Sequence, residues 1–154
     1  NNSGGLIVNF KILIMGLPGS GKTTLASKLK PLIQAQWLNA DAIRKSENDW
    51  DFSEFGRLRQ AKRMSKLADK VIKKGNHVIC DFVCPTVQTR KVFDADITVW
   101  MNTIEQSEYN DTNKMFVPPI LANGEEVDFE IREFDADTWA QTIHSILKLR
   151  MNTK

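Results

Sequence analysis

The chain has 154 residues, a mass of 17.5 kDa, 42% hydrophobic residues and 26% charged residues, a composition typical of one compact domain with its own core. Its formal net charge of +2 argues against a protein that coats nucleic acid through bulk charge, so any phosphate chemistry must come from individually placed residues. The two cysteines, Cys80 and Cys84, have no second Cys or His cluster beside them, which predicts reduced thiols and argues against a structural zinc.

Residues 1–5, NNSGG, lack an initiator Met, and we interpret them as a cloning remnant in front of a single domain at 6–154. No apolar run approaches the roughly 20 residues that cross a membrane, and no signal-peptide pattern opens the chain. We therefore expect a cytoplasmic protein with no membrane partner. The oligomeric state stays open at this point, with a homodimer as one candidate assembly.

Four short apolar runs are continuous rather than alternating, which predicts strands covered on both faces; they are 11–16, 36–40, 77–82 and 96–101. Between them, residues 22–34 and 53–74 have the apolar periodicity of helices, and a Lys-Gly-Asn sequence at 74–76 is typical of a helix end. Strands that alternate with helices predict an α/β fold, with a doubly wound, mostly parallel sheet of about five strands and helices on both faces.

The last third of the chain is less regular. Residues 103–119, rich in Asn, Asp and Thr and closed by two prolines, predict a lid segment with a short helix inside. Residues 119–131 have the pattern of a hairpin that turns at Asn123-Gly124 and ends in a strand. Asp135 or Asp137 can cap a final helix, whose inward face is expected to hold Trp139, Ile143, Ile146 and Leu147.

The segment GLPGSGKT directly follows the first apolar run and fits the P-loop pattern G-x-x-x-x-G-K-[ST]. Its glycines let backbone N–H groups surround phosphates, Lys22 can reach the β and γ oxygens, and Thr23 offers a hydroxyl to Mg²⁺. The helix that starts here adds its positive end. The segment predicts a P-loop NTPase fold that binds ATP with Mg²⁺, through Gly16, Gly19, Ser20, Gly21, Lys22, Thr23 and Thr24.

A P-loop alone does not separate a kinase from a GTPase. A GTPase needs a guanine-binding N-K-x-D motif late in the chain, and the nearest text here is NTK at the very end, with no strand before it. The small size and the polar lid segment favour a kinase that closes over ATP and excludes water from the γ-phosphoryl group.

Two charged residues follow the second predicted strand, where an acceptor would face the γ-phosphate. Asp41 can take a proton from an acceptor hydroxyl or hold Mg²⁺ through water, and Arg44 can bind an acceptor anion. The alternative is that Asp41 only caps a helix and Arg44 is a surface residue. Beside a P-loop we favour the functional interpretation, with Lys22, Asp41 and Arg44 as the catalytic residues.

Asp81 closes the third apolar run. In P-loop proteins a carboxylate at the end of a strand beside the P-loop organises Mg²⁺. We therefore predict a metal site that involves Thr23, Asp41 and Asp81.

Several segments after the P-loop resemble those of adenylylsulfate kinases, which phosphorylate the ribose 3′-hydroxyl of adenosine 5′-phosphosulfate. That family typically shows DGDNxR, then GFS, then an Arg and an Asn on the following helix, and later FISPY with a trailing Arg. This sequence shows NADAIR at 39–44, DFS at 51–53, Arg57 with Gln60, and FVCPT at 82–86 with Arg90, in the same order. The resemblance covers roughly residues 10–120 and implies ATP-dependent phosphoryl transfer to that small nucleotide.

The resemblance also implies roles on the acceptor side. Arg44 and Arg57 would bind the phosphosulfate, and Asp41 would be the acid/base or metal-organising carboxylate. Phe52 and Phe116 would enclose the acceptor purine, an arrangement that orients a planar ring at low entropic cost. The remaining positions that match substrate-binding positions of the family are Gln60, Cys84 and Lys114.

This sequence also departs from the family pattern. Asn39, Ala40 and Ala42 replace Asp, Gly and Asn of DGDNxR, and Gln60 replaces the helix Asn. Cys84 stands where the family has the serine of FISPY, so a thiol would line the site there. These changes all fall on the acceptor side, so the ATP site is better determined by sequence than the acceptor.

Two alternatives therefore stay open. A stripe of basic residues on the second helix favours a kinase that acts on a 5′-hydroxyl or a hydroxymethylated base of nucleic acid, although such a stripe is more often a solvated face; its members are Arg59, Arg63, Lys66, Lys70 and Lys73. The altered NADA segment also allows a nucleotide-binding module without turnover.

Overall fold

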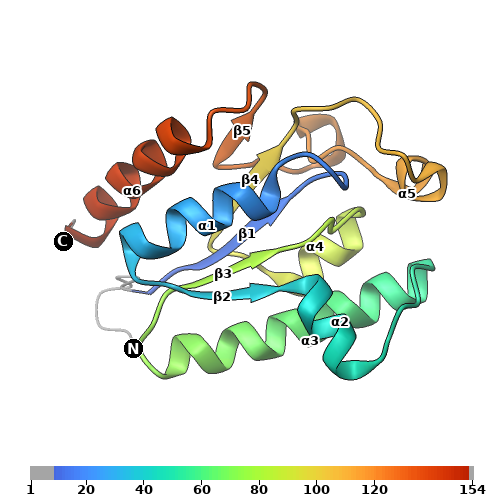
Figure 1. The fold of residues 1–154 in the computed structure, drawn as a ribbon, viewed down its shortest axis with the longest axis horizontal. Coiled ribbons are helices and arrows are strands. Elements are labelled where there is room, and N and C mark those ends of the chain that lie inside the picture. Colours follow the sequence, from blue (N-terminus) through green and yellow to red (C-terminus); the bar gives the residue numbers. More distant parts are fainter. Residues whose placement is uncertain (1–8, 153–154) are drawn as a thin grey trace.

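The computed structural model describes residues 9–152 and contains five strands in the order β2-β3-β1-β4-β5, every neighbouring pair parallel (Figure 1). The strands are β1 (Lys11–Met15), β2 (Gln36–Asn39), β3 (Val78–Asp81), β4 (Ile97–Met101) and β5 (Phe129–Ile131). The predicted doubly wound parallel sheet is confirmed. The predicted remnant at 1–5 lies outside the described residues.

Helices cover both faces of this sheet. They are α1 (Lys22–Ile33), α2 (Ala40–Glu47), α3 (Glu54–Lys73), α4 (Val87–Phe93), α5 (Asn110–Met115) and α6 (Ala136–Asn152). Helices α1 and α6 pack together on one face, and α3 and α4 pack on the other (Figure 1). Side chains of β1 alternate between these two cores, with Ile12 and Ile14 in the first and Leu13 and Met15 in the second. A strand buried on both faces needs apolar residues at every position, which explains the continuous apolar run.

Helices α1 and α3 confirm the sequence-based boundaries to within a residue. Helix α1 ends at Ile33, because Gln34 takes a left-handed conformation with φ of 54°. Helix α3 begins after Ser53, whose hydroxyl accepts a 3.2 Å hydrogen bond from the Gly56 N–H. It ends at Lys73, before Gly75 with φ of 91°.

The predicted hairpin at 119–131 is wrong. Leu121–Asn123 form a single 3₁₀ turn closed by Gly124, and β5 pairs parallel with β4 rather than antiparallel with a preceding strand. The backbone groups of 118–120 are engaged locally, since the Pro118 carbonyl accepts hydrogen bonds from the Asn123 side chain and the Ile120 N–H. The turn chemistry at Asn123-Gly124 therefore ends a turn and does not connect two strands.

Helix α6 holds the C-terminal part of the chain against α1. Asp135 rather than Asp137 caps it, because its carboxylate accepts a 3.1 Å hydrogen bond from the Thr138 N–H. Ile143 and Leu147 are fully buried, as predicted. No helix among the described residues is long and apolar enough to cross a membrane.

Candidate active site

The P-loop joins β1 to α1 at the carboxyl edge of the sheet. Gly21 has φ of 103° and Gly19 has φ of 84°, left-handed conformations that favour glycine. Lys22 begins α1, and its Nζ donates a 3.0 Å hydrogen bond to the Leu17 carbonyl, so the ammonium lies across the loop. Burial lowers the pKa of Lys22 to about 8, although the charges of Asp81 and Asp41 oppose that shift. The loop thus presents an ammonium that forms no ion pair within the described chain, beside backbone N–H groups at a helix start.

Asp81 is the last residue of β3, and the sheet register places it opposite Ile14 of β1 and Asn39 of β2. Its buried carboxylate accepts hydrogen bonds from Thr23 Oγ1 at 3.0 Å, Trp37 Nε1 at 2.8 Å and Asn39 Nδ2 at 3.2 Å. Burial raises the pKa of Asp81, and the three donors oppose that rise. Sequence reasoning found Asp81 but missed Trp37 and Asn39 as its partners, because their proximity depends on strand order.

The hydroxyl of Thr23 and the carboxylate of Asp81 are chemically suited to a hard divalent cation. Among the described residues, no group of three or more His, Cys, Asp or Glu side chains is arranged to hold a metal ion. Mg²⁺ keeps several waters and takes other ligands from substrate phosphates, so it does not need a cage made entirely of protein ligands. The residues present therefore fit a Mg²⁺ ion that arrives with a nucleotide.

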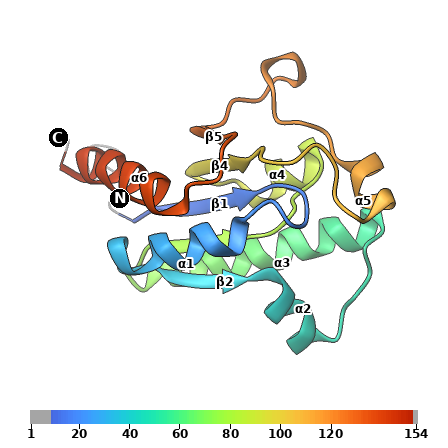
Figure 2. The same ribbon diagram turned by 45° about the horizontal axis from the view of Figure 1, so that its top comes forward.

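A cavity of about 980 Å³ runs from the P-loop to α5. Figure 2 shows α2 and α5 beyond the carboxyl ends of the strands, the edge at which parallel α/β sheets bind their ligands. The sequence-predicted residues that the cavity brings together are Gly19, Lys22, Thr23, Asp41, Arg44, Phe52, Arg57, Gln60, Asp81 and Cys84. Residues that lie more than 50 positions apart in the chain thus line one space.

Arg44 and Arg57 are almost completely buried in the wall of this cavity, 3% and 9% exposed. Arg44 donates to the carbonyls of Asp49 and Asp51, and Arg57 donates to Thr112 Oγ1 at 2.7 Å. Arg57 Nε is buried without a hydrogen-bond partner, and no carboxylate of the described chain forms an ion pair with Arg57. Burial and the neighbouring Arg44 lower the pKa of Arg57 to about 10. Two adjacent buried cations without full compensation favour the binding of an anion.

Asp41 lies in the first turn of α2 and is exposed to the cavity. The helix cap is Asn39, whose side chain accepts a 3.0 Å hydrogen bond from the Ala42 N–H, so the alternative that Asp41 only caps the helix is wrong. The charge of Asp41 raises the pKa values of Lys22, Arg44 and Arg57, against the effect of burial. Asp41 is therefore a carboxylate among three cations, between the P-loop and the buried arginines.

Comparison with known proteins decides the family. The family model described as adenylylsulphate kinase matches residues 8–115, more than half of the chain. This chain belongs to the adenylylsulphate kinase family. A probable adenylyl-sulfate kinase of Aeropyrum pernix is 34% identical over 90 residues, a match that covers 53% of this chain and 48% of that protein. The chain thus spans about half the length of this curated relative.

Solved structures show the same fold. The Mycobacterium tuberculosis APS kinase in complex with AMPPNP and APS superposes with a TM-score of 0.70 at 19% identity, over 92% of this chain and 99% of that one. Shikimate kinase from Acinetobacter baumannii in complex with shikimate has a TM-score of 0.64 at 16% identity, over 94% and 96%. The fold is therefore shared among P-loop kinases that differ in their acceptors.

Two residues predicted from the family resemblance, Lys114 and Phe116, do not line the cavity. Phe116 is stacked on Trp100, with 6.5 Å between ring centroids, and packs against the core under α3. The N–H of Val117 donates to the Pro85 carbonyl at 2.7 Å and holds this segment to the loop after β3. The expected pair of phenylalanines around a purine is therefore absent from this conformation, because α5 turns its first residues, and not its last, toward the cavity.

Other aromatic residues line the cavity instead. Trp50 and Tyr109 are half exposed at its wall together with Phe52. Both guanidinium groups lie over the ring of Phe52, with Arg44 Cζ 4.5 Å and Arg57 Cζ 5.0 Å from the ring centroid. The local sequence DWDFS could have indicated Trp50, and Tyr109 is the single tyrosine of the chain, inside the predicted lid.

The remaining predicted acceptor-side residues have structural partners. Gln60 donates to the Ala40 carbonyl at 3.0 Å and accepts from Arg63, so both ends of its amide are engaged by the protein. Cys84 lines the cavity with a buried thiol, and burial raises its pKa to about 12. Arg90, on α4, pairs with Glu125 at 2.7 Å and donates to the carbonyls of Cys84 and Val117, which joins three loop segments. It therefore stabilises the cavity wall and does not line the cavity.

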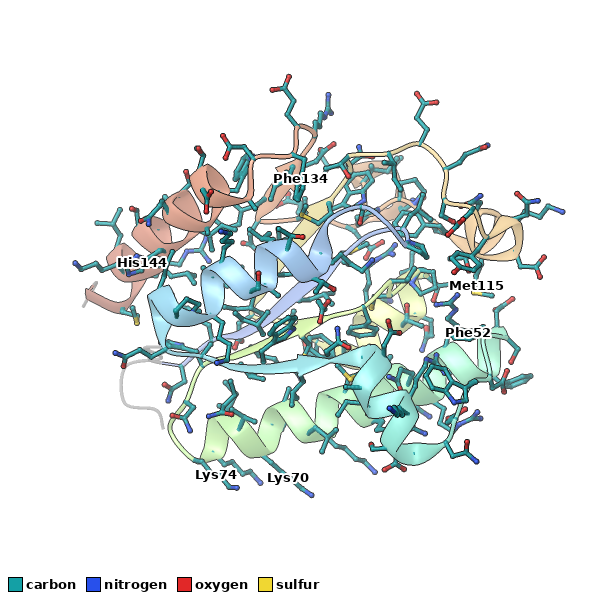
Figure 3. All side chains as sticks on the ribbon, viewed as in Figure 1. Phe52, Lys70, Lys74, Met115, Phe134 and His144 are labelled. Atoms are coloured by element: carbon teal, nitrogen blue, oxygen red, sulfur yellow. The ribbon has the colours of Figure 1, made fainter. Side chains whose placement is uncertain are left out.

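The basic stripe on α3 is partly neutralised. Arg59 and Arg63 both donate to the Asp49 carboxylate at 2.8 Å, and these hydrogen bonds hold the pKa of Asp49 well below its usual value. Figure 3 shows Lys70, a member of the stripe, pointing into solvent near the other end of the helix, as does Lys74 just after that end. Only part of the stripe is thus free to contact a phosphate backbone, which favours the interpretation as a solvated face.

Proposed function

We propose that this chain is an ATP-dependent kinase that transfers the γ-phosphoryl group of ATP to the 3′-hydroxyl of adenosine 5′-phosphosulfate. The observation that carries the proposal is the pair of buried arginines, Arg44 and Arg57, in the same cavity as the P-loop. An acceptor that bears phosphate and sulfate would compensate these two charges, which no carboxylate of the described chain neutralises fully. Membership of the adenylylsulphate kinase family supports the same acceptor.

On the donor side, the P-loop backbone and Lys22 would hold the β- and γ-phosphates of ATP, with Ser20, Thr23 and Thr24 at the start of α1. Thr23 and Asp81 would hold Mg²⁺, Asp81 through water, and Asp41 lines the same cavity. Mg²⁺, when bound, neutralises charge on the transferring phosphoryl group. Lys22 would stabilise the negative charge that moves to the β,γ-bridging oxygen as the bond to the leaving ADP breaks.

On the acceptor side, Asp41 would accept the proton of the ribose 3′-hydroxyl as its oxygen attacks the γ-phosphorus in line with the leaving ADP. Arg44 and Arg57 would bind the phosphosulfate and fix the ribose at attack distance. Phe52 would carry the acceptor purine on the exposed part of its ring, since Phe52 is 47% exposed.

Turnover with defined acceptors tests this proposal. Formation of ADP from Mg·ATP is measured in a coupled assay with adenosine 5′-phosphosulfate, with a 5′-hydroxyl oligonucleotide, and with no acceptor. We expect the phosphosulfate alone to stimulate ADP formation and the phosphoryl group to appear on its 3′ oxygen. If only the oligonucleotide stimulates ADP formation, nucleic acid and not the phosphosulfate is the acceptor. If ATP binds but neither compound stimulates ADP formation, the chain is a nucleotide-binding module without turnover.

A further inference from the structure

A second hollow, of about 350 Å³, lies at the P-loop and the first residues of α1. Its lining is Gly19, Gly21, Lys22, Thr23, Thr24 and the side chain of Phe134. Phe134 belongs to the segment between β5 and α6, and Figure 3 shows it above the first turn of α1. Its ring lies against the P-loop backbone, because a Cβ added at Gly21 would be 2.6 Å from Phe134 Cε1.

Exposed aromatic rings in this protein are concentrated at its two hollows. Five aromatic side chains are exposed among the described residues, and Trp50, Phe52 and Tyr109 line the main cavity while Phe134 lines the second hollow. The fifth, Phe55, lines neither. Phe134 is 55% exposed, so a large part of its ring is available for a planar ligand.

The direction of phosphoryl transfer decides which ligand reaches this ring. The two hollows share Gly19, Lys22 and Thr23, where the phosphates of the donor would lie. In-line transfer places the acceptor and the leaving ADP on opposite sides of the γ-phosphoryl group. Gly21, Thr24 and Phe134 line the second hollow and not the main cavity, so with the acceptor in the main cavity ADP would extend past Thr24 toward Phe134.

We propose that Phe134 carries the base of the donor nucleotide, which stacks on the exposed part of its ring. The inference rests on the proposed kinase function and deepens it by assigning the nucleoside end of the donor site. Phe134 lies outside residues 8–115, the region that the family model matches, so the resemblance provides no assignment for it.

Equilibrium binding of two probes, ADP and inorganic tripolyphosphate, tests this proposal by calorimetry in the presence of Mg²⁺. Tripolyphosphate contacts the P-loop but has no base. Removing an aromatic platform weakens binding of a stacked base by about tenfold. We expect Phe134→Ala to lower ADP affinity by that factor and to leave tripolyphosphate affinity unchanged, with Phe134→Leu similar to Ala because it keeps the contact with Gly21 but lacks a ring. Phe55→Ala is the matched control and should change neither.

The outcomes separate the inference from the proposed function. Equal losses for ADP and tripolyphosphate in Phe134→Ala would mean that Phe134 only supports the P-loop, and unchanged ADP affinity would mean that the base lies elsewhere. Either result would overturn the inference alone. A wild-type chain that binds neither probe would overturn the proposed function and the inference together.

Discussion

The donor and acceptor sides of the cavity differ in how far the protein itself supplies hydrogen-bond partners for their buried charged groups. On the donor side, the Asp81 carboxylate accepts hydrogen bonds from Thr23, Trp37 and Asn39, all on neighbouring strand ends or the P-loop helix. On the acceptor side, Arg57 has a single hydroxyl partner, on α5, and a buried Nε without one. The Asp81 carboxylate has its hydrogen-bond donors before a ligand binds, whereas the Arg57 guanidinium is completed only by an anion. Within the P-loop, the buried Ser20 Oγ has no hydrogen-bond partner among the described residues. Variants on the two sides should therefore affect different kinetic constants.

The largest effect is expected for Asp41→Asn, which removes the proposed proton acceptor between the two sides. Loss of a general base lowers kcat by about 10² to 10⁴-fold. ATP affinity should stay nearly unchanged, because the P-loop is intact. Steady-state kinetics with adenosine 5′-phosphosulfate and ATP binding by calorimetry give the two values. Unchanged kcat would show that Asp41 has no catalytic role.

The next largest effect is expected for Lys22→Met on the donor side. Removing a group that stabilises transition-state charge costs about 10² to 10³-fold in kcat. The KM for the acceptor should stay within about twofold if the two sides are independent. Lys28→Met, on the same helix with an exposed ion pair to Asp137, is the control. A large rise in the acceptor KM of Lys22→Met would contradict the separation of the two sides.

Arg57→Met should act mainly on the acceptor. Loss of a hydrogen bond to a charged group weakens binding by about 10 to 100-fold, so the KM for adenosine 5′-phosphosulfate rises while the affinity for ADP is kept. Arg57→Lys should recover part of the loss, since it restores the charge but not the planar fork. Lys66→Met on the same helix is the control. If Arg57→Met weakened ADP binding as much as acceptor binding, this arginine would belong to the donor side instead.

A smaller effect is expected for Trp37→Phe, which keeps a smaller aromatic ring and removes the N–H that donates to Asp81 at 2.8 Å. One lost hydrogen bond is worth about a factor of 2 to 10. The change should appear as a raised Mg²⁺ requirement with little change in the acceptor KM, if Trp37 orients Asp81 toward the metal. Trp139→Phe, which removes an indole N–H far from the cavity, should leave the Mg²⁺ titration unchanged. A wild-type Mg²⁺ titration for Trp37→Phe would argue against this positioning role.

The smallest effect concerns Cys84. Burial raises its pKa to about 12, so the thiol stays protonated at pH 8 and its thiolate fraction increases only as the pH approaches that value. A disulfide reagent at pH 8 should leave Cys84 unmodified in the native chain and modify it after unfolding in urea. Rapid labelling of the native chain would show a thiol activated by the site.

Local sequence patterns were sufficient to predict the donor side of the site. The P-loop and the boundaries of α1 and α3 follow from glycine conformations, a serine cap and apolar periodicity, all of which act within a few residues of one another. The prediction of a hairpin at 119–131 was wrong because it also used only short-range signals. Asn123-Gly124 is a correct turn signal, but only pairing with β4 decides the direction of the strand that follows.

The sequence by itself determined the parallel α/β fold and the P-loop, and it was sufficient to identify Asp41, Arg44 and Arg57 as candidate acceptor-side residues. Only the tertiary structure decided which aromatic rings line the cavity, since Phe116 packs on Trp100 while Trp50 and Tyr109 reach the wall. It also decided that Trp37 and Asn39 hold Asp81, because these contacts join residues more than 40 positions apart. Periodicity and capping are short-range effects, whereas the partners of a buried charge or ring are set by strand order and packing across the whole chain.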